Sequence, residues 1–264
     1  MDKLAEIMAY KREELSPRLR PARDEEFVVQ GERRAELHVF RDALGSEDEL
    51  SVISEIKRRS PSAGEIAVIP SAEEQARLYL NAEVDALSVL TDEKFFGGSL
   101  QDLWNVAEFI RSHERATPCL RKDFVFHPIQ VLEAAEAGAS AILIIARALD
   151  DEEMGELRRV ADLAGLDCLY EVHDDEEIGR ILDHDPLIVG VNNRNLSTFE
   201  TDLAITERLL PLIPDHVVTV SESGIAEPED AWRARDAGAD AVLCGEALMR
   251  AEDPETFVAA MKEA

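Results

Sequence analysis

Acid–base side chains stand where several short apolar runs of this sequence end. Glu55 and Lys57 end the first run, and because strand side chains alternate, we expect both on one side and Ile56 on the other. Lys122 and Glu171 end two later runs in the same way. Lysine can donate a proton and recover it when desolvation moves its pKa, and glutamate can accept one. If these ends meet at one rim, the sequence predicts general acid–base catalysis there.

Lysine usage supports this interpretation. The chain has 22 arginines and only six lysines. Four lysines lie near the termini or in an expected loop: Lys3, Lys11, Lys94 and Lys262. The other two, Lys57 and Lys122, both follow apolar runs. Arginine would serve if only positive charge were needed, and burying such groups without function is costly.

The last three runs end in groups that suit binding. The sixth ends in Asn192, with Arg194 two residues later, and the seventh ends in Glu222. The seventh and eighth lead into small residues before a helix, at Ser223–Gly224 and Gly245–Glu246. Free backbone N–H groups at such turns bind phosphate, and the glycines allow close approach. We expect the Glu246 side chain to point away, leaving its N–H to bind.

Metal chemistry is not expected. The six histidines are scattered, and the three cysteines stand alone in apolar runs, which predicts buried thiols, no disulfide and no metal site. We predict that no cofactor is required. His173, beside the rim, is predicted not to be catalytic.

Eight apolar runs alternate with helical stretches. The runs cover residues 50–56, 84–90, 117–124, 140–146, 166–172, 186–192, 216–222 and 240–246. Between them, Ser71 and Glu74 form a capping box, Pro128 stands near a first helical position, and Gly138 and Gly165 end two helices. Near-continuous apolar strands separated by helices are typical of a parallel sheet covered by helices.

The alternation predicts one α/β domain over 1–264, a closed (β/α)8 TIM barrel. Residues 1–49 form an N-terminal helical extension with helices at roughly 2–15 and 32–44. A doubly wound sheet fits less well, because it would more often have five or six strands and a glycine-rich first turn. Active sites of such barrels lie at the C-terminal strand ends, where the residues above stand.

Composition limits the partners. The 264 residues carry 56 acidic and 28 basic side chains, a net charge of −28, which would repel nucleic acid and anionic membranes. The N-terminus is charged throughout, and no run approaches the length of a membrane span, so we expect a cytoplasmic protein. The excess of acids and the scarcity of lysine predict adaptation to high salt, which screens self-repulsion.

Seven segments resemble indole-3-glycerol phosphate synthase, in order and across nearly all of 32–264. They are SEIKRRSPSAGEI (54–66), LTDEKFFGGSLQDL (90–103), LRKDFVFHPIQV (120–131), YEVHDDEE (170–177), VGVNNRNLSTFETD (189–202), VSESGI (220–225) and VLCGEALMR (242–250). The resemblance implies conversion of 1-(2-carboxyphenylamino)-1-deoxyribulose 5-phosphate to indole-3-glycerol phosphate, carbon dioxide and water, in tryptophan biosynthesis. It also suggests a monomer that associates at most weakly with other enzymes of that pathway.

The resemblance also implies roles for individual residues. Lys122 matches the general acid and Glu171 the general base of dehydration, whereas Lys57 matches a lysine near the substrate carboxylate and a second candidate proton donor. Groups that hold substrate hydroxyls and tune the lysines correspond to Glu55, Asn192 and Glu222. Which lysine donates each proton stays open.

Binding roles follow from the same resemblance. Arg194 matches the contact to the substrate carboxylate. The phosphate site corresponds to Ser60, Ser223, Gly224, Gly245 and Glu246, and the apolar walls around the aromatic ring to Phe96, Phe124 and Leu196. Many members of the family carry serine at the position of Glu246.

Two other functions are compatible with a phosphate-binding barrel, and the residues present argue against both. A barrel of this kind could bind a phosphorylated metabolite without converting it, but its signature would be loss of Lys122 or Glu171, and both are present. A related phosphate-sugar isomerase would use Asp and Cys, or two Asp, as its acid–base pair. The first strand offers Glu55 and Lys57 instead.

Overall fold

Eight parallel strands close into a barrel in the computed structural model, which describes residues 3–46, 49–61, 64–67, 69–113, 115–195 and 200–263. In barrel order the strands are β1 (Ser51–Ile56), β4 (Ala86–Leu90), β5 (Cys119–Lys122), β6 (Ala141–Ile145), β7 (Asp167–Val172), β8 (Ile188–Asn192), β9 (Val218–Glu222) and β10 (Ala241–Cys244). β10 pairs with β1 and closes the sheet. The predicted (β/α)8 barrel is confirmed, and each predicted apolar run contains one strand.

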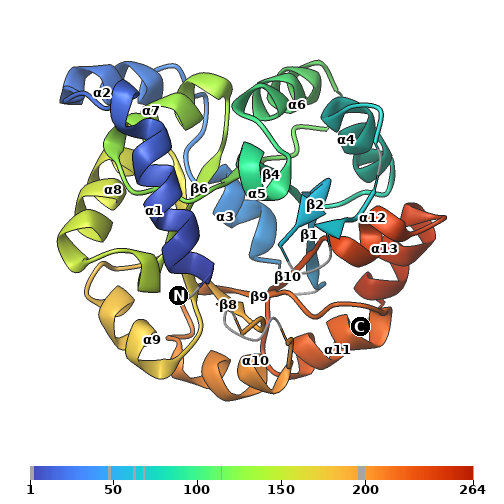
Figure 1. Ribbon diagram of the computed structural model, residues 1–264. Helices are drawn as coiled ribbons and strands as arrows, with labels where there is room; N and C mark the ends of the chain where they lie inside the picture. The colour runs from blue at the N-terminus through green and yellow to red at the C-terminus, as the bar shows by residue number, and fades with distance from the viewer. Residues whose placement is uncertain are drawn as a thin grey trace.

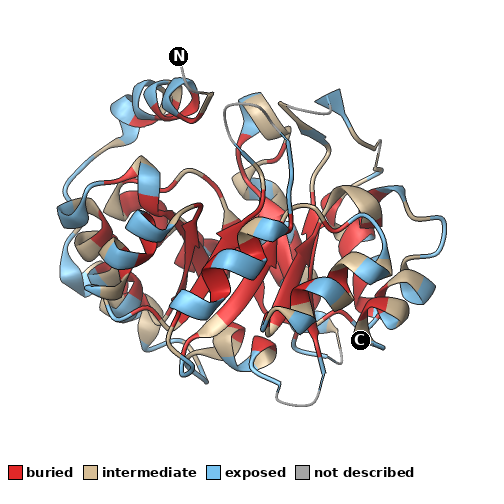
Figure 2. Cartoon of the chain, turned by 90° about the horizontal axis from the view of Figure 1, so that it is seen from below, coloured by how far each residue is buried: buried red, intermediate tan, exposed pale blue. Residues whose placement is uncertain are grey.

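Helices surround the barrel (Figure 1). Those between the strands or after the last one are α4 (Ala72–Asn81), α5 (Glu93–Phe96), α6 (Leu100–Ser112), α7 (Pro128–Ala137), η2 (Ala146–Ala148), α8 (Asp151–Ala164), α9 (Asp175–Leu182), α10 (Ala204–Leu209), η3 (Leu210–Leu212), α11 (Pro228–Asp236), α12 (Glu246–Arg250) and α13 (Pro254–Lys262). Ser71 caps α4 by accepting from the Glu74 N–H, and Gly138 and Gly165 end α7 and α8 with positive φ, as their sequence positions predict. The strands between the helices are almost entirely buried (Figure 2), because side chains fill the barrel on one side and helices cover the other.

The described part of the N-terminal extension contains three helices and one short 3₁₀ turn, and here the prediction was partly wrong. They are α1 (Lys3–Leu15), η1 (Ser16–Arg18), α2 (Asp24–Gly31) and α3 (Val39–Leu44). The predicted helix at 2–15 is present, but the one at 32–44 is confined to 39–44 and α2 was missed. α2 begins in the segment interpreted as a connection, where acidic residues occupy its first turn and Glu26 accepts from the Arg23 N–H.

A buried carboxylate determines where α3 begins. Asp167 at the start of β7 accepts from the backbone N–H groups of Phe40 and Arg41 and lies 2.8 Å from Nδ1 of His38. His38 itself takes a positive φ of 57°, which interrupts any helix there. The start of α3 is therefore set by a contact between His38 and Asp167. These residues are 129 positions apart, so the local sequence does not reveal the start of the helix.

Helix α1 lies apart from the outer ring, over the end of the barrel where the strands finish (Figure 2). Lys11, interpreted above only as a lysine near the terminus, is buried and pairs with Asp92 at 2.8 Å and Asp123 at 3.1 Å. Burial opposes its charge, but Asp123 and Asp92 outweigh this and raise the pKa of Lys11. Because these aspartates follow β4 and β5, the ion pairs hold α1 against the rim.

Two short elements in the loops above the barrel carry predicted site residues. Strands β2 (Arg59–Ser60) and β3 (Gly64–Glu65) pair antiparallel after β1 and place Ser60. Helix α5 is capped by Asp92, which accepts from the N–H groups of Phe95 and Phe96. Both elements lie on the same side of the barrel as α1.

Candidate active site

A cavity of about 610 Å³ opens at the C-terminal ends of the strands. Every predicted site residue that the structure describes lines it: Glu55, Lys57, Ser60, Phe96, Lys122, Phe124, Glu171, Asn192, Arg194, Glu222, Ser223, Gly224, Gly245 and Glu246. The remaining one, Leu196, lies outside the described residues. Side chains from widely separated parts of the sequence thus meet at one rim, as the barrel requires.

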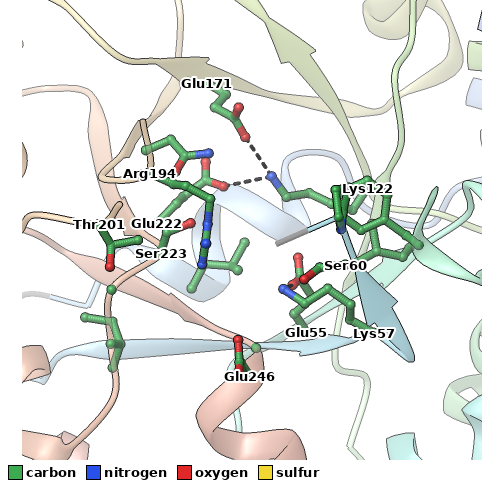
Figure 3. A pocket seen from close by; sticks show the side chains of 18 of the residues that line it. Glu55, Lys57, Ser60, Lys122, Glu171, Arg194, Thr201, Glu222, Ser223 and Glu246 are labelled. Atoms are coloured by element: carbon green, nitrogen blue, oxygen red, sulfur yellow. Dashed lines mark hydrogen bonds and ion pairs between the residues drawn. The ribbon is translucent and has the colours of Figure 1, made fainter. Parts of the chain in front are cut away.

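Lys122 lies between two glutamates at the centre of this cavity (Figure 3). Its Nζ donates to Glu171 Oε2 and to Glu222 Oε2, both at 2.8 Å. The three side chains come from β5, β7 and β9 and are only 12%, 5% and 1% exposed. Two carboxylates share one cation, so a proton can move within this group without a charge leaving the cavity.

The surroundings shift the pKa values of Lys122, Glu171 and Glu222 in different directions. Burial opposes the charge of Lys122, but Glu171, Glu222 and Glu55 hold its pKa above the ordinary value. Burial also opposes the charge of Glu171, yet Lys122 and His173 lower its pKa well below the ordinary range. For Glu222, burial prevails with help from the charges of Glu171 and Glu55, and raises its pKa to about 7. As pH falls, Glu222 therefore gains a proton first, and Glu171 stays ionised to lower pH.

A second ion pair stands at the end of β1. Lys57 Nζ lies 2.5 Å from Glu55 Oε1, so the two side chains share a face as the alternation predicts. Gly245 makes room for them, since a Cβ there would lie 2.6 Å from Glu55 Oε1 and 3.2 Å from Lys57 Nζ. Figure 3 shows this pair across the cavity from Glu171.

A second glycine, missed by the sequence analysis, makes room for Glu222. Gly190 on β8 is paired in register with Glu171 on β7 and with Val220 on β9. A Cβ at position 190 would collide with Glu222 Oε1. The absent side chain is therefore what lets the Glu222 carboxyl lie inside the barrel next to Lys122.

The segments after β9 and β10 contain four of the residues predicted to bind phosphate, and these residues line the cavity. Ser223 and Gly224 have φ values of 65° and 88°, and the Ser223 backbone is strained for a residue with a side chain. Asn193 holds this turn, because its Nδ2 donates to the carbonyl oxygens of Glu222 and Ser223, both at 3.1 Å. Asn193 was not predicted as a site residue, because its role depends on hydrogen bonds to distant segments of the chain.

Glu246 and Arg194 extend the polar lining. Glu246 borders the cavity and pairs with Arg250 one turn along α12, at 2.9 Å. The Arg194 side chain lines the cavity on the side of Glu222 and Ser223 in the view of Figure 3, and its backbone N–H donates to Asn192 Oδ1 at 3.0 Å. Arg194 also forms an antiparallel bridge with Thr201, which lines the cavity as well.

Apolar residues form the floor, one wall and a roof. The rings of Phe96 and Phe124 stand 5.9 Å apart and tilted by 39°. The floor consists of Leu90, Leu143, Ile145 and Leu243. Lys3, Leu4 and Ile7 of α1 also border the space. Sequence reasoning missed these three, because nothing local indicates that α1 crosses the rim.

Other predicted features can be placed as well. Cys119, Cys168 and Cys244 are free and buried, as predicted. Within the described ranges, no group of three or more His, Cys, Asp or Glu side chains is arranged to hold a metal ion. The described helices include none long and apolar enough to cross a membrane.

Comparison with known proteins gives a consistent result. A family model described as indole-3-glycerol phosphate synthase matches residues 4–261. Proteins of that name from Opitutus terrae and Aquifex aeolicus are 56% and 40% identical, covering 98% and 95% of this chain and 97% and 95% of their own lengths. Among solved structures, the tryptophan synthase alpha subunit of Legionella pneumophila is similar at a TM-score of 0.64 and 16% identity, covering 87% of this chain and 98% of that one. At that identity the similarity shows the fold alone.

Proposed function

The chain belongs to the indole-3-glycerol phosphate synthase family, and we propose that the residues around Lys122 close the indole ring by general acid–base catalysis. The chain is a carboxy-lyase that converts 1-(2-carboxyphenylamino)-1-deoxyribulose 5-phosphate to indole-3-glycerol phosphate, carbon dioxide and water. The observation that carries the residue assignment is the Lys122 ammonium held between Glu171 and Glu222.

Ring closure is assigned to Lys122. The ring carbon that bears the carboxylate attacks the ribulose carbonyl, whose oxygen gains negative charge and needs a proton. Lys122 is buried, charged and directed into the cavity by β5, so it can supply that proton. Attack interrupts the aromatic ring, and loss of carbon dioxide restores it. That restoration drives decarboxylation and places no demand on a metal or cofactor.

Dehydration is assigned to Lys122 and Glu171 together. An acid must protonate the departing hydroxyl, so Lys122 first regains from solvent the proton that it gave up in ring closure. A base must then remove a proton from the new ring. Glu171 is ionised and lines the cavity next to Lys122, so its carboxylate is in place to accept this proton. Glu222, with its pKa raised to about 7, holds Lys122 from the other side and contacts a substrate hydroxyl. Glu55 and Asn192 contact the hydroxyls from β1 and β8.

The remaining lining binds the two ends of the substrate. Lys57 and Arg194 carry the positive charges that face its carboxylate. The phosphate binds to backbone N–H groups and hydroxyls at Ser60, Ser223, Gly224, Gly245 and Glu246, the last through its backbone. Its aromatic ring lies between Phe96 and Phe124 under the apolar face of α1, with Leu196 as a further proposed contact.

Conversion of the proposed substrate distinguishes this function from its alternatives. Indole fluorescence appears if the cavity closes the ring. A phosphate-sugar isomerase would instead interconvert this compound and its N-glycoside isomer, and a binding protein would leave both unchanged. Either result without an indole product would reject the proposed function.

Gly190→Ala is expected to reduce kcat by about 10²-fold with a smaller change in KM, because the new Cβ displaces Glu222 from Lys122. Gly179→Ala in α9 is the matched control, since a Cβ there meets nothing within 4 Å. Initial rates and thermal melting of both proteins check this. Equal kcat values in the two variants would contradict the role given to Gly190.

We also propose that the chain is adapted to high salt. With a net charge of −28, its melting temperature should rise between about 0.1 M and about 2 M potassium chloride, over which the Debye length falls from about 10 Å to below 3 Å. Thermal melting at the two concentrations measures this. Equal or higher stability at the lower concentration would reject salt adaptation.

The proposal extends to the location, oligomeric state and partners of the protein. We propose a cytoplasmic monomer whose partners are small phosphorylated molecules, with at most weak association with other enzymes of tryptophan biosynthesis. The charge of −28 favours this over nucleic acid or an anionic membrane. The extension 1–49 and the barrel would form one folding unit, because the ion pairs of Lys11 join them.

A further inference from the structure

His173, which the sequence analysis predicted not to be catalytic, lies directly behind Glu171. It follows β7 two residues after Glu171 and is 8% exposed. Its Nε2 lies 3.6 Å from Glu171 Oε1, and its Nδ1 lies 3.3 Å from Glu177 Oε2. The imidazole therefore stands between two carboxylates, one in the cavity and one on α9.

Glu177 fixes the position of this ring. Its Oε2 also accepts from the backbone N–H of His173 at 2.7 Å. Its Oε1 accepts from Arg147 Nε at 2.5 Å, and Arg147 pairs in turn with Asp174 at 3.0 Å. The side chains of Glu171, His173, Glu177 and Arg147 thus form a row from the cavity to η2, where Arg147 is partly exposed.

A purely structural histidine would be satisfied by Glu177 alone. Nε2 of His173 makes no hydrogen bond to a described residue, yet it is buried and faces Glu171. At 3.6 Å, Nε2 of His173 and Oε1 of Glu171 are in contact but do not form a hydrogen bond. An imidazolium presents an N–H toward each carboxylate, whereas a neutral ring presents a lone pair to one of them.

We propose that His173, held by Glu177, is a positioning residue that keeps the Glu171 carboxylate charged and directed toward the substrate. Lys122 holds Oε2 of Glu171, and Nε2 of His173 stands by Oε1, so both oxygens of the carboxylate face a nitrogen group. The inference rests on the proposed function, because that function assigns Glu171 as the base of dehydration.

The test uses His173→Gln in the full-length protein. We expect KM to stay nearly constant and kcat to fall about tenfold. The acid limb of the pH profile of kcat should move up by about one pH unit, which is at the lower end of the pKa shifts that a neighbouring charge causes. His184→Gln is the matched control, because His184 is partly buried and its Nε2 also has no hydrogen-bond partner among the described residues. Glu177→Gln, which leaves the ring in place, should shift the limb in the same direction by less.

A titration that needs no turnover separates this inference from the proposed function. Carbon-13 NMR of labelled glutamate carboxyls follows Glu171, assigned by its absence in Glu171→Gln. Its midpoint should rise in His173→Gln and stay constant in His184→Gln. An unchanged midpoint and an unchanged acid limb would overturn the role of His173. If the wild type forms no indole product but the midpoint shifts, the proposed function fails and the coupling of His173 to Glu171 stands.

Discussion

Lys122→Arg is expected to lower kcat by about 10²–10⁴-fold while leaving the fold and much of the substrate binding intact. Arginine keeps a positive charge between Glu171 and Glu222, so the attraction for substrate survives. It cannot give up a proton in a protein, with a pKa above about 12, and so cannot act as the acid of ring closure. The measurement is kcat at saturating substrate across pH, because product release can otherwise mask the chemical step.

Lys57→Arg is the matched comparison. Lys57 pairs with Glu55 near the proposed carboxylate site, where charge is the main requirement. We expect this variant to retain much more activity than Lys122→Arg. If Lys57→Arg is the more damaging change and Lys122→Arg keeps more than about a tenth of wild-type kcat, against the loss expected of an acid, then the acid is Lys57.

Glu171→Gln should be the second severe lesion, again about 10²–10⁴-fold in kcat, because an amide cannot accept the proton of dehydration. Glu222→Gln is its isosteric control on the same lysine and should be milder. The two variants should also differ in pH dependence. Glu171 has a lowered pKa and stays charged as pH falls toward the acid range, whereas the pKa of Glu222 is raised to about 7.

The pH profiles test this assignment. Wild-type kcat should show one titration near pH 7, where Glu222 loses its proton as pH rises, and an acid limb where Glu171 gains one as pH falls. Glu222→Gln should lose the titration near neutrality and keep the acid limb. If Glu222→Gln instead loses the acid limb and most of its activity, the roles of the two glutamates are reversed.

The barrel could be predicted because its signals are local. Each βα unit carries its own apolar strand, helix cap and terminating glycine, as at Ser71, Gly138 and Gly165. The rim could be predicted too, since a closed parallel barrel brings all strand ends to one face. Residues at strand ends, such as Lys122 and Glu222, therefore lie close together, and this does not depend on the conformation of the loops.

Features held by distant contacts could not be predicted in this way. The position of α1 depends on Lys11 meeting Asp92 and Asp123, more than 75 residues away. The start of α3 depends on Asp167 in the same manner. Neither partner is marked by its own neighbours in the sequence, so a helix was expected over 32–44 and the apolar roof was missed.

Two site features left a signal that could have been used. Glu171 and His173 have the same two-residue spacing that grouped Glu55 with Lys57, so His173 belonged on the cavity side by the same argument. Gly190 interrupts an otherwise bulky strand, which indicates close approach of another group. That the approaching group is Glu222 follows only from the register of β8 with β9.

The most direct test of the account is to mix metal-depleted protein with 1-(2-carboxyphenylamino)-1-deoxyribulose 5-phosphate and measure indole fluorescence and released carbon dioxide together. The account predicts equal amounts of indole product and carbon dioxide, no dependence on added metal or cofactor, and near-complete loss of both in Lys122→Arg. Binding of the substrate without carbon dioxide release, or full activity of Lys122→Arg, would contradict it.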